Sequence, residues 1–232
     1  MIAPAYYRSL LSPDEQDVYK DIVLGLLRRS PAIFIRQEYA QPETIRKIVN
    51  AVHLDHPELF SVRFWDFHMT RVLLPPGAFL HFQMMLDAEP SNAVLGTLNA
   101  KAARLQTAAR QVDSPAERYL LIAKEIASTT KYVDTDSGFW EHTIAGPGLR
   151  GQSVCEGIAK TFLFFCQRLN LRCAVATGTM HGIPHAWNVV ELDGVIKYVD
   201  VTASLQSMNL HSILPGTFFK SEQALRRNGY DW

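Results

Sequence analysis

Apolar residues recur with a helical period in two segments near the N-terminus. The segment SPDEQDVYKDIVLGLLRR opens with Ser12 as a helix N-cap, Pro13 at the first helical position and Glu15 completing a capping box. It predicts a helix that runs to about Arg29. A second helix is predicted from Pro42 to about Leu54, where one stripe carries Ile45, Ile48, Val49 and Val52.

The pattern then changes to one typical of strands. The segments VRFWDFHMTRVLL (62–74) and AFLHFQMMLD (78–87) are rich in aromatic and β-branched residues, and Pro75, Pro76 and Gly77 separate them. They predict a β-hairpin. Helical patterns return over residues 92–112 and after a second Ser-Pro-x-Glu start signal at residues 114–117. We therefore expect an N-terminal α/β accessory region, residues 1–90, packed on a core that spans residues 91–232.

The C-terminal half combines one apolar helix with an antiparallel meander. The segment RGQSVCEGIAKTFLFFCQRLNL predicts a helix from Cys155 to about Asn170, with an apolar face broad enough to be buried against a sheet. The segments LRCAVATG, AWNVVEL and VIKYVDVT predict strands, and Asp193-Gly194 is a two-residue hairpin turn. This order predicts an α+β fold.

The hairpin turn brings candidate chemical groups together. With Asp193 and Gly194 as the turn, Trp187 would face Asp200 and His185 would face Thr202. His185 and Asp200 would then emerge on one face of the sheet as diagonal neighbours.

The cysteine at the start of the apolar helix completes a set of three groups. The positive end of the helix macrodipole favours a thiolate at Cys155. Cys155, His185 and Asp200 thus offer a nucleophile, a base and an orienting carboxylate. Gly157 keeps the space behind the nucleophile small, and the backbone N–H of Cys155 is a natural oxyanion donor.

Three motifs carry a family resemblance. GQSVCEGIAKTF, HAWNVVELDG and YVDVT resemble the core motifs of the transglutaminase-like superfamily. The resemblance implies a papain/transglutaminase-like core, with Cys155 as nucleophile, His185 as general base and Asp200 as orienter. It also implies cysteine-dependent acyl transfer on peptide or glutamine amides through a thioester, with a protein or peptide as substrate. We expect hydrolysis rather than cross-linking, because water is in excess at an open site.

Other residues near these motifs have less defined roles. Bacterial members often carry DVTWD where this chain has DVTAS, so Ala203 removes an aromatic wall. Candidates for the second oxyanion donor are Gln152 and Trp140, whereas Trp187 is expected to form a packing wall beside the three groups. The rival base is His181, which the sequence GTMHGIP places in a predicted loop.

The remaining cysteines and the composition exclude several classes of protein. Cys166 and Cys173 are expected in the core, and three unclustered cysteines favour a reducing compartment. The 23 basic and 23 acidic residues give no net charge, which argues against nucleic-acid binding. No spacing typical of a zinc or calcium site is present, so no metal and no cofactor are expected.

The last expectations from the sequence concern the compartment of the protein and an alternative function. No apolar run approaches the roughly 18 residues of a membrane span, and no secretory signal is visible. The chain is therefore expected to be cytoplasmic, unless a leader has been removed from it. The sequence leaves the oligomeric state open. It also leaves an alternative function, because an inactive transglutaminase-like module that binds peptides or glycans could keep the same motifs.

Overall fold

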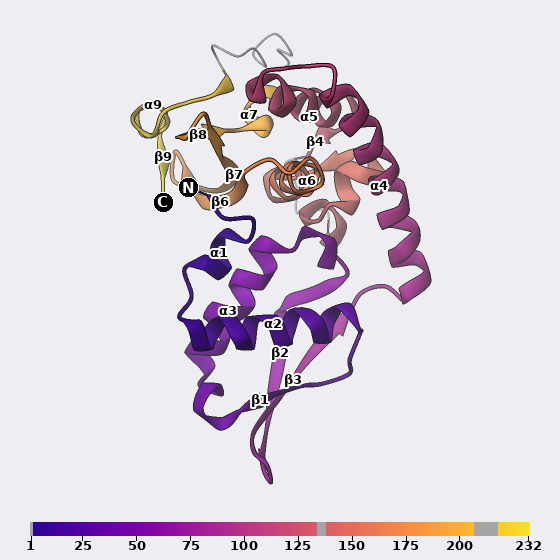
Figure 1. Ribbon diagram of the computed structural model, residues 1–232, viewed down its shortest axis with the longest axis vertical. Coiled ribbons are helices and arrows are strands. Elements are labelled where there is room, and N and C mark those ends of the chain that lie inside the picture. Colours follow the sequence, from indigo (N-terminus) through magenta and orange to yellow (C-terminus); the bar gives the residue numbers. More distant parts are fainter. Residues whose placement is uncertain (1, 134–137, 207–217) are drawn as a thin grey trace. The chain divides into compact units, whose positions relative to one another are not determined.

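The computed structural model describes residues 2–133, 138–206 and 218–232. The chain divides into two compact units, one formed by Ala5–Ser91 and the other by Asn92–Trp232 together with residues 2–4 (Figure 1). The division falls in the first turn of helix α4 (Ala88–Ala109), beside the predicted boundary between residues 90 and 91. Among the described residues, no helix is both long enough and apolar enough to cross a membrane.

The N-terminal residues are the one segment assigned to a different unit from the predicted one. Ile2 is buried, and its backbone N–H donates to Oε2 of Glu191 at 2.7 Å. A residue at the very start of the chain is thus fixed to the larger unit.

The smaller unit packs helices on a three-stranded antiparallel sheet. Its helices are α1 (Tyr6–Ser9), α2 (Pro13–Leu27) and α3 (Pro42–Asp55), with 3-10 turns at Gln37–Tyr39 and Pro57–Leu59. Its strands are β1 (Ile33–Arg36), β2 (Val62–Leu73) and β3 (Pro76–Met84), in the order β1-β3-β2. Both predicted helices and the predicted hairpin are confirmed.

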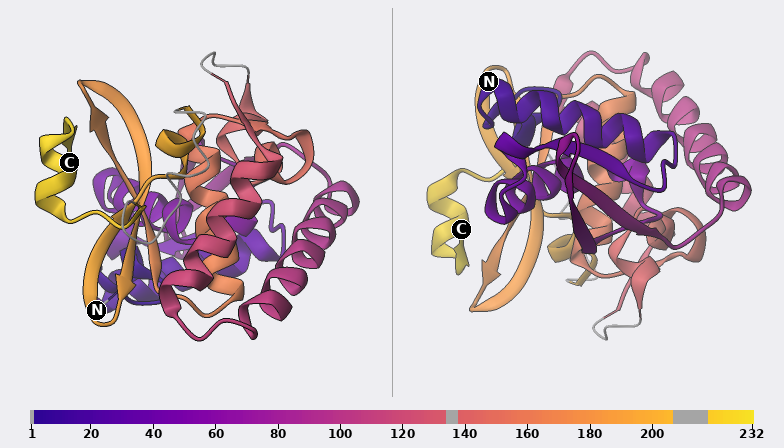
Figure 2. Two further views of the ribbon diagram at one scale, coloured as in Figure 1. Left: turned by 90° about the horizontal axis from the view of Figure 1, so that it is seen from above. Right: turned by 90° about the horizontal axis from the view of Figure 1, so that it is seen from below.

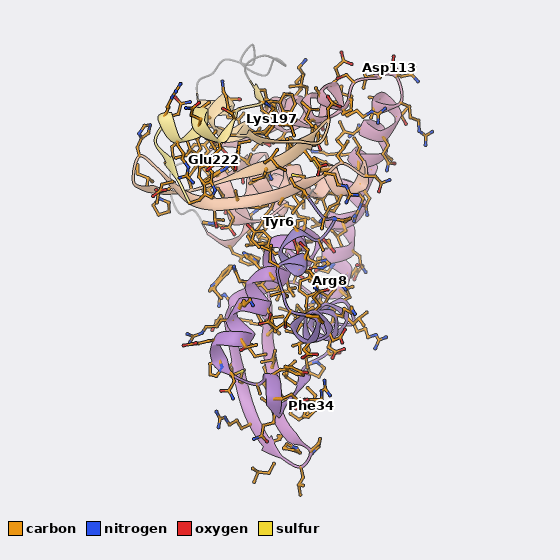
Figure 3. The ribbon with its side chains drawn as sticks, turned by 60° about the vertical axis from the view of Figure 1, so that its left-hand side comes forward. Tyr6, Arg8, Phe34, Asp113, Lys197 and Glu222 are labelled. Atoms are coloured by element: carbon orange, nitrogen blue, oxygen red, sulfur yellow. The ribbon has the colours of Figure 1, made fainter. Side chains whose placement is uncertain are left out.

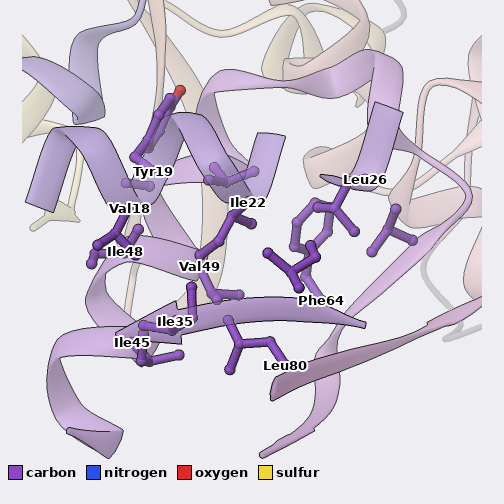
Figure 4. Packing of buried hydrophobic residues seen from close by; sticks show 14 of the residues in the cluster. Val18, Tyr19, Ile22, Leu26, Ile35, Ile45, Ile48, Val49, Phe64 and Leu80 are labelled. Atoms are coloured by element: carbon purple, nitrogen blue, oxygen red, sulfur yellow. The ribbon is translucent and has the colours of Figure 1, made fainter. Parts of the chain in front are cut away.

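Local signals explain where the helices begin and which faces they bury. Ser12 Oγ accepts from the backbone N–H of Glu15, and Ser12 N–H donates to Oε2 of Glu15 at 2.8 Å, so the predicted capping box forms. The apolar stripes of α2 and α3 meet the sheet residues Ile35 and Leu80 in one core (Figure 4). Burying a side chain of this size contributes roughly 1.5–3 kcal/mol.

Strand β1 and the exact hairpin turn were not predicted. β1 contains only four residues at the edge of the sheet, with Phe34 on it (Figure 3), and so short a segment carries little periodicity. In the hairpin, Leu73 pairs with Pro76, so the turn consists of Leu74 and Pro75 and excludes Pro76 and Gly77. A β-bulge interrupts the pairing of β2 and β3 between Arg63 and His68.

The larger unit places one buried helix against a four-stranded antiparallel sheet (Figure 2). That helix is α6 (Cys155–Arg168), and it also contacts α5 (Pro115–Thr129). The sheet has the order β8-β7-β6-β9, formed by β6 (Cys173–Met180), β7 (Ile183–Leu192), β8 (Val195–Val199) and β9 (Tyr230–Asp231). The fold is therefore α+β, as predicted.

Shorter elements join these parts. A parallel pair is formed by β4 (Lys131–Tyr132) and β5 (Gln152–Ser153), and the helical turns η3 (Phe139–His142) and η4 (Gly146–Arg150) lie between them in sequence. Two short helices, α7 (Val201–Gln206) and α9 (Glu222–Arg227), complete the described part of the unit. Helix α5 begins at its predicted start, but Ser114 forms no capping hydrogen bond through its side chain.

Two predictions about the meander need correction. The predicted loop GTMHGIP is largely strand, because β6 runs to Met180, β7 starts at Ile183, and only His181 and Gly182 form the turn. Both turn residues have positive φ (52° and 78°), which suits a tight hairpin. The predicted strand 195–202 ends at Val199, and the chain then enters α7.

Candidate active site

The three predicted site residues lie at the ends of three elements of the larger unit. Cys155 is the first residue of α6 and is partly exposed. His185 lies on β7, with 8% of its surface exposed. Asp200 follows directly after the last residue of β8. Because α6 packs on β7, the start of the helix and the sheet form one site.

His185 is hydrogen-bonded to its predicted partner Asp200. Its Nε2 lies 2.7 Å from Oδ2 of Asp200, so Nδ1 is the ring nitrogen that does not face this carboxylate. Burial alone lowers the pKa of His185. The hydrogen bonds to Asp200 and Cys155 and the charges of these two groups outweigh burial and raise the pKa to about 9. The imidazole is therefore protonated at neutral pH.

Asp200 is positioned by the helix that the sequence failed to predict. Its Oδ1 accepts from the backbone N–H of Ala203 at 3.1 Å, as the cap of a helix does. The hairpin register is as predicted, since Leu192 pairs with Val195 and Asn188 with Val199. The ladder ends there, so the expected pairs of Trp187 with Asp200 and of His185 with Thr202 do not form. The capping carboxylate starts a helix where β-branched residues had favoured a strand.

Tyr230 is a site residue that sequence reasoning missed. Its hydroxyl donates to Oδ2 of Asp200 at 2.7 Å, and its ring stands edge-on to His185 with the centroids 5.8 Å apart. Burial, and then the charge of Asp200, raises the pKa of Tyr230, so the hydroxyl stays a donor. Tyr230 lies on the two-residue strand β9, where it pairs with Met180. A two-residue strand carries no local pattern that could predict a partner fifty residues away in the sequence.

The first turn of α6 holds an acidic residue whose charge is compensated. Glu156, next to the cysteine, accepts from Lys160 at 2.6 Å and lies 2.8 Å from Nδ1 of His142. Burial lowers the pKa of Lys160, and the charge of Glu156 opposes that effect. Glu156 is thus tied to basic groups. A carboxylate paired in this way repels a thiolate at the neighbouring Cys155 less strongly than an unpaired carboxylate would.

Gly157 is required by close packing behind the nucleophile. A Cβ atom at this position would overlap the backbone oxygen of Glu141 and Oγ of Ser153. Glu141 O also accepts from the backbone N–H of Val154, which precedes Cys155. The start of α6 is therefore pressed against the turn that contains Glu141, and the first N–H groups of the helix have no partner within it.

The candidates for a second oxyanion donor contact other groups. Gln152 donates from Nε2 to Oε1 of the buried Glu141 at 3.4 Å. Trp140 packs its ring edge-on against Phe139, and the guanidinium carbon of Arg150 lies 5.6 Å from the ring centroid. No contact of either residue with Cys155 is found in the described part of the chain. The second donor remains a prediction.

One aromatic and one amide residue next to His185 lie where packing requires them. Trp187 is 1% exposed and stacks on His185 with the centroids 6.0 Å apart, so it forms a wall behind the imidazole and cannot line an open surface. Asn188 donates to Ala159 O at 3.0 Å and to Ala174 O at 3.3 Å. It ties α6 to the sheet, as expected of a residue on the opposite face.

The other cysteines lie in the core, and the rival histidine lies in a turn that lines one pocket together with Asp200. Cys166 and Cys173 are buried, free thiols, and burial raises the pKa of Cys166. His181 is exposed in the turn between β6 and β7, and Asp200 bonds His185 instead. Among the described residues, no group of three or more His, Cys, Asp and Glu side chains is arranged to hold a metal ion.

Asp200 also lines a pocket of about 360 Å³. Ala203 lines it together with Asp200, Tyr230 and Lys220. Ala203 thus lines a cavity at the position where bacterial members of the family often carry a tryptophan.

The fold and site define an α+β unit with a cysteine at a helix start and a histidine-carboxylate pair on the facing sheet. This arrangement agrees with the one implied by the transglutaminase-like motifs. Two solved structures are similar to the chain. One is described as a TGase (14% identity, TM-score 0.44, 70% of this chain and 48% of the other). The second, from Cytophaga hutchinsonii, is described as a "putative cysteine protease" (12% identity, TM-score 0.38, 71% and 64%).

The chain spans about half the length of the first of these structures. Both TM-scores lie below 0.5, so the fold class rests on the chain's own elements. No family model and no curated protein matches the chain.

Proposed function

We propose that this protein is a cysteine-dependent acyl-transfer enzyme that acts on amides of a protein or peptide. The observation that carries the proposal is the 2.7 Å contact of His185 with Asp200, combined with a cysteine at the start of α6 that, together with Asp200, raises the pKa of the imidazole to about 9. These three groups supply a nucleophile, a proton carrier and a group that orients the carrier.

In the first half of the reaction, the Cys155 sulfur attacks the amide carbonyl as a thiolate. The S–C bond forms as the carbonyl π electrons move to oxygen, and the backbone N–H of Cys155 at the start of α6 can donate to that oxyanion. The tetrahedral intermediate then collapses, and the C–N bond breaks. The leaving amine takes its proton from the His185 imidazolium, so a thioester and a neutral imidazole remain.

In the second half, an acceptor attacks the thioester. Water loses a proton to neutral His185, the C–S bond breaks, and the thiolate and imidazolium are restored with the release of a carboxylic acid. The partial exposure of Cys155 supports hydrolysis, because water can reach an acyl group on its sulfur. A primary amine in place of water would give cross-linking by the same steps.

Thiol labelling tests the nucleophile. Because Cys166 and Cys173 are buried, iodoacetamide should modify Cys155 alone in the native protein. An ordinary thiol with a pKa of about 8.5 is only about 0.3% ionised at pH 6. We expect Cys155 to react at pH 6 at least about tenfold faster than free cysteine. A rate that follows free cysteine from pH 5 to pH 9 would contradict an activated nucleophile.

Turnover is tested with a peptide library, offered with and without a primary amine and followed by intact mass. We expect an acyl adduct on Cys155 and cleaved peptides, and both should be lost in Cys155→Ala. Cys173→Ala is the matched control, since it removes a thiol from the same unit outside the site. Bound peptide with an unmodified, unreactive Cys155 would instead identify the binding module.

A further inference from the structure

A second pocket in the larger unit has no connection with the reactive groups. It has a volume of about 260 Å³ and lies where the end of α4, the first turn of α5 and the end of α6 converge. Three arginines from these three elements line it, with Gln106 and Asn170 beside them: Arg110, Arg118 and Arg168. Figure 3 labels Asp113, in the turn between α4 and α5. The pocket lining itself contains no carboxylate.

The arginines are held by contacts that leave their charge uncompensated. Arg168 donates from Nε to Oδ1 of Asn99 at 3.0 Å, and its guanidinium carbon lies 4.4 Å from the Phe164 ring centroid. Arg118 donates from Nη2 to the Val112 carbonyl at 3.3 Å, while its buried Nε has no hydrogen-bond partner. Within residues 2–133, 138–206 and 218–232, none of the three guanidinium groups forms an ion pair with a carboxylate.

The partial charges of the nearby helix ends offset only part of the positive charge of the three arginines. Arginines near helix C-termini offset the negative end of the macrodipole, which amounts to about half an elementary charge for each helix. The C-terminal ends of α4 and α6 and the N-terminal end of α5 meet at this pocket, so the three partial charges together offset only about half of one positive charge. An excess of more than two positive charges remains, in a cavity lined by hydrogen-bond donors.

We propose that this pocket binds the dianionic phosphoryl group of a phosphate monoester. Such a group carries a charge of about −1.5 to −2 at pH 7 and offers three acceptor oxygens. Arginine's planar fork matches these oxygens in bidentate geometry. A volume of about 260 Å³ suits a phosphoryl head group better than a large ligand. The pocket shares no residue with the Cys155 site, so the proposal stands independently of the proposed function.

Isothermal titration of the full chain at constant ionic strength tests this site, with phosphoserine as the probe. Arg110→Gln is the informative variant, because Arg110 is exposed and its loss should leave the fold intact. Arg104→Gln is the matched control, since it removes the same charge from an exposed position on α4, six residues before Arg110 and outside the pocket. Loss of one charge-assisted contact should raise the Kd about tenfold or more in the first variant, whereas the control should change it less than about twofold.

The pH dependence and the choice of probe sharpen the test. The second proton of phosphoserine leaves near pH 6, so binding should be tighter at pH 7.5 than at pH 5, whereas sulfate binding should not change. Tighter binding of a phosphoserine peptide than of inorganic phosphate would indicate that the pocket recognises a phosphorylated protein segment. Equal binding of the two would indicate that it recognises the phosphoryl group alone. Absence of binding, or equal weakening by Arg110→Gln and Arg104→Gln, would overturn the proposal.

Discussion

Replacing His185 with Gln should remove a pH-dependent part of the stability of the larger unit. The pKa of His185 is about 9 in the folded chain and has an ordinary value of 6.5. The folded state therefore binds this proton more tightly than the unfolded state does. The resulting stabilisation is complete below pH 6.5, and it is lost as the pH rises through about 9.

The size of the effect follows from the two pKa values. Their difference, between about 9 and 6.5, corresponds to about 3.4 kcal/mol, since each pKa unit is worth about 1.36 kcal/mol. That value is an upper limit, because solvent near the partly buried pair screens its interaction. We expect about 2 kcal/mol. In His185→Gln, Asp200 keeps its bonds from Tyr230 and Ala203, so the variant should fold.

Urea unfolding followed by tryptophan fluorescence measures the difference. A Trp65→Phe background leaves tryptophans only in the larger unit, at positions 140, 187 and 232. At pH 6, His185→Gln should be less stable than its parent by about 2 kcal/mol, or about 1 M urea for a slope near 2 kcal/mol per M. By pH 10 the two curves should approach each other. Curves that stay parallel from pH 6 to pH 10 would refute the assigned charge of His185.

Two further substitutions test how the site is supported. Tyr230→Phe removes one donor to Asp200 and should lower the free energy of unfolding by about 1.5–3 kcal/mol. The carboxylate then holds the imidazolium more strongly, so the alkaline limb of the pH-rate profile should move to higher pH; an unmoved limb would argue against a positioning role. Gly157→Ala should cost about 1–3 kcal/mol of stability and displace Cys155, seen as slower iodoacetamide labelling, because its Cβ overlaps Glu141 O. Labelling at the parent rate would show that the helix start adjusts.

Local chemistry explains the predictions that the structure confirms. The capping box at Ser12 and Glu15 needs only residues three apart, and the stripe of α3 needs only one helical period. The Asp193-Gly194 turn set the register of β7 and β8, because a two-residue hairpin fixes which residues pair. That register brings the end of β8 beside β7, and Asp200, one residue beyond the ladder, then reaches His185.

Competition between local preferences explains one error. Val199, Val201 and Thr202 favour a strand, whereas the carboxylate of Asp200 favours the start of a helix. The sequence contains both signals. The ladder stops at Asn188 and Val199, and α7 follows, so the cap prevails in the folded chain.

The sequence by itself determined the α+β order of elements and the choice of Cys155, His185 and Asp200 as site candidates, because both depend on periodicity, turns and motifs within short segments. Tertiary structure alone decided that Tyr230 bonds Asp200, that Gln152 turns to Glu141, and that three arginines from separate parts of the chain converge on one pocket. These contacts join residues that are far apart along the chain or that lie on separate elements. Their geometry depends on how whole elements pack, which no local pattern encodes.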